Sequence, residues 1–229
     1  MHWINSHPQL VFYILLLIAV LLSRIPMAGK YFRSLNTLIH EAGHAFATLA
    51  LSGEVIAVNL FADTSGTTVT KAKSKFSQAI ISLAGYPFSA LVSLLCLYML
   101  ASGLNLYILF TLTSITLIIM ILSIKNAYGY FWTGTFILLN ILLIYFNNKL
   151  LVSISATFFT LIIFTDAIIS AFILLALSIK QPKKAGDATN MNKLTGLHSA
   201  FWAVFLLAIT LLISYFSVVH YFPSLRSIF

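Results

Sequence analysis

Seven apolar runs, each near the length of about 20 residues that a helix needs to cross a bilayer, occupy most of this chain. Charged residues make up only 8% of it and the mean hydropathy is +1.01, whereas a soluble domain carries about 25% charged residues. Only Ser102 and Gly103 separate the third run from the fourth, so the number of spans stays open at six or seven. The runs are Pro8–Ile25, Phe32–Leu51, Phe76–Ala101, Leu104–Ile124, Tyr130–Phe146, Leu150–Ile179 and Leu197–Phe222. The pattern predicts an all-α polytopic membrane protein with the lipid bilayer around it, residues 1–229 forming a single membrane-embedded domain.

The charge and cysteine content exclude two kinds of site. The 13 Lys and Arg residues behind the net charge of +8 are scattered among the apolar runs, as expected for charges that orient helices in a bilayer. We therefore expect no nucleic-acid partner. Cys96 is the single cysteine and lies in an apolar run, which excludes a disulfide within the chain and a metal site built from cysteines.

The segment His40-Glu41-Ala42-Gly43-His44 lies inside the second apolar run. Positions i and i+4 of a helix share a face, so His40 and His44 can supply two ligands of a tetrahedral Zn²⁺, with Glu41 beside them as a general base. With 6 His residues in the chain, the pattern arises by chance about once in a thousand such chains. Ionisable residues are costly in lipid and are usually functional there. The motif predicts a catalytic zinc site.

The polar stretch over residues 53–75, just after this motif, predicts a β-hairpin at the membrane surface. Glu54–Phe61 is rich in β-branched residues, Asp63–Gly66 has turn chemistry, and Thr67–Thr70 is again strand-like. An open strand edge at Val55–Phe61 could hold an unwound peptide by strand addition. The alternative is an ordinary connecting hairpin.

These features together resemble the site-2 protease family of intramembrane zinc metalloproteases, and most closely its compact branch without a PDZ domain. Shorter similarities are Ala84-Gly85-Tyr86-Pro87, Lys125–Gly129 and Gly186-Asp187-Ala188. The resemblance implies a zinc ion held by two histidines and one aspartate. It also implies cleavage of transmembrane segments of other membrane proteins, by a multi-pass protein of the bacterial cytoplasmic membrane.

Two aspartates compete for the place of the third ligand. Asp166 lies in the middle of an apolar run, where a carboxyl group must be protonated, hydrogen-bonded or metal-bound. Asp187 lies in a polar connection, and its Gly-Asp-Ala setting is similar to a Ser-Asp-Ala element of the compact branch. The physical argument favours Asp166 and the resemblance favours Asp187.

The expected activity is hydrolysis of a peptide bond, with Glu41 moving a proton from the attacking water to the leaving amine. One alternative is a metal-binding regulatory module with little proteolytic activity, which the absence of the family's usual Asp-Gly ligand keeps open. A cation transporter is a third possibility. Transport favours ionisable residues spread over several helices and an internal repeat, and this sequence has neither.

Overall fold

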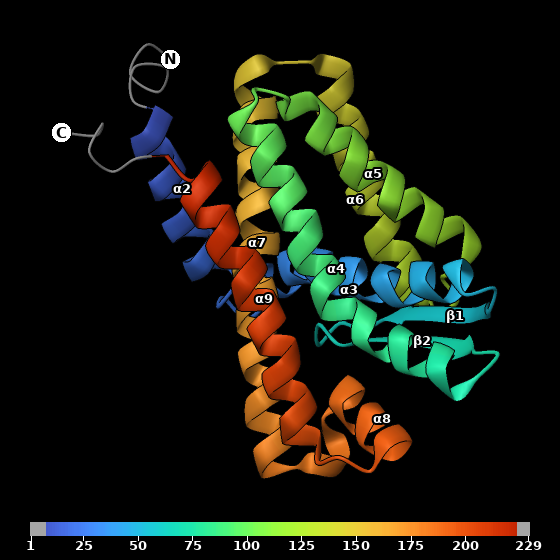
Figure 1. Cartoon of the computed structure of the whole chain (residues 1–229). Helices are drawn as coiled ribbons and strands as arrows, with labels where there is room; N and C mark the ends of the chain where they lie inside the picture. The colour runs from blue at the N-terminus through green and yellow to red at the C-terminus, as the bar shows by residue number, and fades with distance from the viewer. Residues whose placement is uncertain (1–7, 224–229) are drawn as a thin grey trace.

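The computed structural model describes residues 8–223, so residues 1–7 and 224–229 of the predicted single domain lie outside the described part. Eight α-helices and one two-stranded sheet make up this part (Figure 1). The helices are α2 (Pro8–Leu22), α3 (Ala28–Ala50), α4 (Lys75–Ala101), α5 (Asn105–Leu122), α6 (Ala127–Phe146), α7 (Lys149–Lys180), α8 (Gly186–Thr195) and α9 (Ser199–Tyr221). The strands are β1 (Glu54–Leu60) and β2 (Gly66–Lys71). The predicted class, a helical membrane protein with a hairpin after the second of the expected spans, is confirmed.

Five of these helices, α4, α5, α6, α7 and α9, are long and apolar enough to cross a membrane. The first and second predicted spans differ from this pattern. Helix α2 has 15 described residues, fewer than a span needs. Helix α3 has 23 residues, but Lys30, Arg33 and the His40–His44 motif lower its hydropathy below that of the five. The structure thus separates five apolar helices from a polar helix that carries the chemistry.

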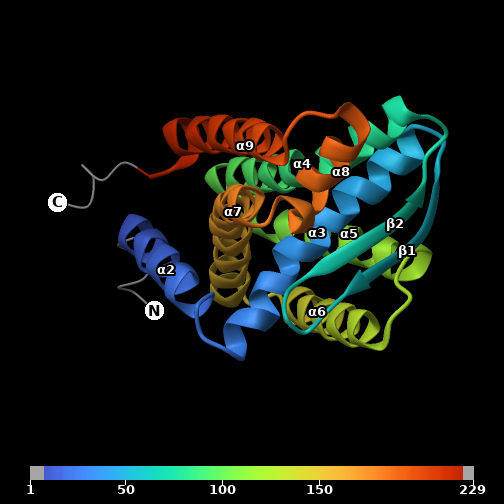
Figure 2. The ribbon, with the colours of Figure 1, turned by 90° about the horizontal axis from the view of Figure 1, so that it is seen from below.

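Helix α7 forms the centre of the molecule and packs against α2, α4, α5 and α9 (Figure 1). In the view from below, α3 crosses beside α7 and runs on between the hairpin and the α4–α8 side of the molecule (Figure 2). The inner face of α3 is apolar and fully buried, with Leu35, Leu38 and Ile39 in the main core. The buried Trp132 of α6 fixes the start of α3, because its Nε1–H donates to the Tyr31 carbonyl at 2.8 Å. Packing of this kind leaves only the polar face of α3 free to line a cleft.

The hairpin forms where the alternation of β-branched residues predicts it. Strands β1 and β2 pair antiparallel, with Leu60 opposite Gly66 and Val58 opposite Thr68. The turn between them is closed by Ser65, whose backbone N–H and hydroxyl both donate to the Asp63 carboxylate at 3.0 and 2.6 Å. These hydrogen bonds hold the pKa of Asp63 below its usual value. The turn is therefore locally stabilised at the exposed tip of the hairpin.

The far edge of β1 is occupied by the connection between α5 and α6. The Val58 N–H donates to the Ser123 carbonyl at 2.7 Å, and the Lys125 N–H donates to the Val58 carbonyl at 3.2 Å. The Asn126 side-chain amide pairs with both backbone groups of Leu60. Strand β1 is thus enclosed on both sides over this part. The open edge of the hairpin is β2, and not the β1 edge proposed from the sequence.

Candidate metal centre

Helix α3 brings the two histidines of the motif together one turn apart. The Nε2 atoms of His40 and His44 lie 3.1 Å from each other. The Nδ1–H of His44 donates to the Ile81 carbonyl of α4 at 2.6 Å, which leaves its Nε2 lone pair free to act as a ligand. The ring of Tyr86, also on α4, packs edge-on against His40. Both imidazoles are therefore held in place by the neighbouring helix.

Asp187 approaches this pair from the first turn of α8. Gly186 precedes it with φ of +45°, a left-handed conformation that glycine adopts without strain. The Asp187 Oδ2 lies 3.2 Å from the Nε2 of His40 and 3.3 Å from the Nε2 of His44. Burial acts to raise the pKa of the Asp187 carboxyl, but the adjacent His44 and His40 outweigh burial and hold that pKa well below 3.8. Asp187 thus offers a carboxylate to the two imidazoles.

The spacing of the three donor atoms suits a zinc ion. In a tetrahedral site with donor bonds of about 2.0–2.1 Å, neighbouring donor atoms lie about 3.3 Å apart. The three separations here are 3.1, 3.2 and 3.3 Å. Three lone pairs this close together repel one another unless a proton or a cation lies between them. His40, His44 and Asp187 therefore fit a divalent cation with one position left open for water or substrate.

Close approach of α4 to α3 at this point depends on Gly85. A Cβ atom on Gly85 would lie 2.5 Å from Cε1 of His40 and 2.6 Å from Nε2 of His44. Any side chain here would displace an imidazole. Gly85 and Tyr86 of α4 thus form the back wall of the site.

Glu41 lies beside the three converging residues but is not one of them. Its buried carboxylate accepts a hydrogen bond at Oε2 from the Thr68 hydroxyl of β2, with a distance of 2.6 Å. A Cβ atom on Gly66, also on β2, would lie 2.6 Å from the Glu41 Oε1. The hairpin therefore orients the carboxylate through Thr68, a role that the sequence alone does not predict. The alternation of residues along the strand predicts that Thr68 points inward, but it does not predict that the Thr68 hydroxyl donates a hydrogen bond to Glu41.

Asp166 lies elsewhere, on α7, and the structure does not bring it into the group of three. Its nearest charged neighbour is Arg33 of α3, with 3.9 Å between the Arg33 Nε and the Asp166 Oδ1. Of the two aspartates considered as the third ligand, Asp187 lies next to the two histidines and Asp166 lies next to Arg33.

A cleft of about 710 Å³ contains the three converging residues and Glu41. Its walls are the polar face of α3, strand β2, the start of α4, the start of α8 and an apolar strip of α7 made of Ile173, Leu174 and Leu177. A second cavity of about 870 Å³ lies near the start of α7 and contains none of the residues of the site. The candidate metal site therefore lies in the first cleft.

A helical membrane protein in which two histidines and one aspartate could hold a metal ion next to a buried glutamate fits the class of membrane metalloenzymes. The family model of Peptidase M50B-like proteins matches residues 12–217, which is most of the chain. The chain is therefore a member of this family, the site-2 protease family of membrane metalloproteases. Among curated proteins and solved structures, none matches the chain.

Proposed function

We propose that the protein is a zinc-dependent intramembrane endopeptidase that hydrolyses peptide bonds in or near transmembrane segments of other membrane proteins. The observation that carries the proposal is the triangle of His40, His44 and Asp187 donor atoms at the spacing of a zinc tetrahedron, with Glu41 alongside. Membership of a metalloprotease family supports it.

In the proposed mechanism His40, His44 and Asp187 hold the zinc ion, and Glu41 transfers the proton. The ion, when bound, supplies a Lewis acid that polarises the scissile carbonyl group. Thr68 occupies Oε2 of Glu41, so Oε1 is the oxygen that accepts the proton of the attacking water and later gives it to the leaving amine. The Thr68 hydrogen bond keeps the carboxylate in one orientation throughout.

Substrate binding is proposed to use the open edge of β2. A transmembrane helix must unwind before one of its peptide bonds can react, and an unwound segment can add to a free strand edge. Residues Thr67–Thr70 of β2 line the cleft on one side, and the apolar strip of α7 lines it on another. An extended, largely apolar peptide fits between a wall of backbone hydrogen-bonding groups and a wall of aliphatic side chains.

The proposed partners are therefore transmembrane proteins, met within the bilayer that surrounds the five apolar helices. The proposed location is the bacterial cytoplasmic membrane. It follows from the resemblance to the compact branch of the family.

The test is the Glu41→Gln variant of the purified, zinc-loaded protein. We expect cleavage of transmembrane peptides to fall by at least 10²-fold, because the general base is lost. Zinc content should stay at the wild-type value, since the three ligands are intact. Glu54→Gln is the matched control, because Glu54 is the other glutamate of the chain and is exposed on β1. Full activity of Glu41→Gln would remove Glu41 from the mechanism. A wild-type protein that binds zinc and cleaves no peptide would favour the regulatory module.

A further inference from the structure

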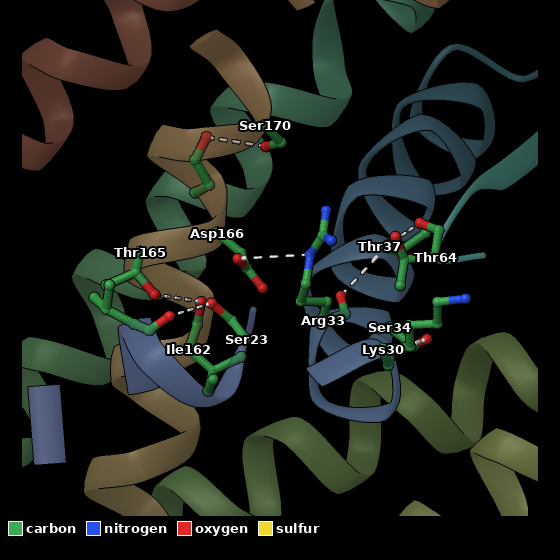
Figure 3. Close-up of polar contacts among 12 residues, drawn as sticks. Ser23, Lys30, Arg33, Ser34, Thr37, Thr64, Ile162, Thr165, Asp166 and Ser170 are labelled. Carbon is green, nitrogen blue, oxygen red and sulfur yellow. Dashed lines mark hydrogen bonds and ion pairs between the residues drawn. The ribbon is translucent and has the colours of Figure 1, made fainter. Parts of the chain in front are cut away.

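An ion pair at one end of the cleft is not used by the proposed mechanism. In Figure 3 the Arg33 side chain of α3 reaches toward Asp166 of α7, and the two groups point toward each other. The distance of 3.9 Å between the Arg33 Nε and the Asp166 Oδ1 is that of a loose pair. The pair contributes no ligand to the group of three.

Asp166 is buried without any hydrogen bond. Its side chain is 5% exposed, and neither carboxylate oxygen has a hydrogen-bond partner among residues 8–223. A buried carboxylate is costly unless a charged or hydrogen-bonded group compensates it. Arg33 is the charged group beside it, so Asp166 attracts and holds the guanidinium group at this position.

Arg33 keeps most of its donors free for another ligand. Its side chain is 29% exposed, and within the described residues no hydrogen bond engages its guanidinium group. The Nε–H faces Asp166, and the four N–H groups on the two terminal nitrogens remain. A planar guanidinium group presents such donors in the geometry that matches a carboxylate.

The distance along α3 from Arg33 to His40 indicates which part of a bound peptide Arg33 can reach. Arg33 lines the same cleft as His40 and Glu41, two helical turns before His40 on the same side of α3. Seven residues of helix span about 10 Å, which is the length of about three residues of extended chain. A peptide lying along the cleft with its reacting bond at the metal ligands therefore brings a side chain about three residues away to Arg33.

We propose, on the basis of the function proposed above, that Arg33 is a specificity-determining residue that receives an acidic side chain of the substrate about three residues from the cleaved bond. Asp166 is a positioning residue, which acts by holding the guanidinium group of Arg33 at the cleft wall. The preferred substrate is thus a transmembrane segment with a Glu or Asp close to the cleaved bond. Lys30, one turn earlier on α3, does not line the cleft, and its side chain points away from Asp166 in Figure 3.

The first experiment measures cleavage of a peptide set by the zinc-loaded protein in lipid vesicles. The peptides share one Ala/Leu/Gly transmembrane sequence and carry a single Glu, Gln or Lys at each position on both sides of the cleaved bond. We expect the wild type to prefer Glu over Gln by roughly 10- to 100-fold in kcat/KM at one position, as for a hydrogen bond between charged groups. Lys at that position should be the poorest substrate.

Variants of the pair distinguish recognition from a purely structural role. Arg33→Gln should abolish the difference between the Glu and Gln peptides while cleavage of the Gln peptide persists, and Arg33→Lys should retain a weaker preference. Asp166→Asn should reduce the preference without reversing it. Lys30→Gln removes a charge from the same helix outside the cleft and should keep the full preference. An equal loss for all peptides in Arg33→Gln would overturn the proposal and leave a structural ion pair.

A binding measurement separates this proposal from the failure of the proposed function. The Glu41→Gln protein is titrated with the fluorescently labelled Glu peptide and the Gln peptide, and binding is followed by anisotropy. We expect tighter binding of the Glu peptide, lost when Arg33→Gln is added. Absence of cleavage in the wild type together with this binding difference would overturn the peptidase function and keep the acidic-side-chain site. Equal binding of both peptides would overturn the site.

Discussion

At the scale of single residues, the two aspartates show how environment assigns different roles to one side chain. Asp187 lies within 3.3 Å of two imidazole nitrogens, whereas Asp166 faces a guanidinium group at 3.9 Å. A carboxylate that faces the Nε2 atoms of two imidazoles can complete a metal site, whereas the charge of a carboxylate beside an arginine is compensated by the guanidinium group. We therefore assign the third ligand to Asp187 as a prediction.

The corresponding test compares Asp187→Asn with Asp166→Asn. We expect the Asp187 variant to lose its bound zinc and its activity, because a catalytic zinc needs three protein ligands. The Asp166 variant should keep one zinc per chain. Metal content of the purified proteins, measured by atomic absorption after dialysis, decides between them. Loss of zinc in the Asp166 variant alone would reverse the assignment.

The hydroxyl of Thr68 gives a second prediction at this scale. Thr68→Val keeps the shape of the side chain and removes the 2.6 Å hydrogen bond to the Glu41 Oε2. We expect kcat to fall roughly 10-fold or more, as for the loss of a hydrogen bond to a charged group, with KM and zinc content unchanged. Thr68→Ser retains the hydroxyl and should restore most of the activity. Equal losses in both variants would mean that Thr68 acts only through packing.

The sequence predicts candidate ligands and a candidate base, but it does not show how they come together. The i, i+4 spacing placed His40 and His44 on one face because that geometry is local to a helix. The distance from His44 to Asp187, and from Asp166 to Arg33, depends on how α8 and α7 pack against α3, and no local pattern records that packing. Burial in an apolar run favoured Asp166, because the sequence did not show that Arg33 would compensate it.

At the scale of elements, the hairpin was predictable and its open edge was not. Alternating β-branched residues and the turn at Asp63–Gly66 define two strands locally. Closure of the β1 edge comes from Ser123–Asn126, more than 60 residues further along the chain. Helix α3 shows the converse case. Its length was predicted well, but its polar residues set it apart from the five apolar helices.

The open edge of β2 leads to a prediction for the backbone. The backbone groups of Val58 and Leu60 point away from β2. In an antiparallel pair, the backbone groups of their partners Thr68 and Gly66 then point toward the free edge of β2. Thr70 lies two residues after Thr68, so its N–H points toward the free edge as well. Thr70→Pro removes one outward N–H and should lower the cleavage rate about fivefold, the value of one backbone hydrogen bond. Thr70→Ala keeps that N–H and is the matched control.

Cleavage rate and zinc content are measured together for these two variants. Zinc content should be unchanged in both, since the three candidate ligands come from α3 and α8 and not from β2. Equal rates for Thr70→Pro, Thr70→Ala and the wild type would show that the substrate does not add to β2, and the hairpin would then be a connector.

At the scale of the whole molecule, α7 determines on which side of the membrane the site lies. Its 32 residues span about 48 Å, more than the roughly 30 Å of a bilayer core, so we expect its two ends to emerge on opposite sides. The α4–α5 and α6–α7 turns lie at one end of the molecule, and the α7–α8 connection lies at the other (Figure 1). By their element bounds, Ser102 and Asn148 belong to the first two turns and Lys183 belongs to the α7–α8 connection. Asp187 follows that connection directly, so the side that exposes Lys183 is expected to be the side nearest the candidate metal site.

Single cysteines at these turns test the arrangement, because the natural Cys96 is buried and provides an unreactive background. We introduce Ser102→Cys, Lys149→Cys or Lys183→Cys and treat sealed vesicles of uniform orientation with a membrane-impermeant thiol reagent. In vesicles of one orientation we expect one of two results. Either Ser102→Cys and Lys149→Cys both react and Lys183→Cys does not, or Lys183→Cys reacts and the other two do not. All three should react in detergent, and the unaltered protein should stay unlabelled. Labelling of all three in sealed vesicles would mean that α7 does not cross the bilayer.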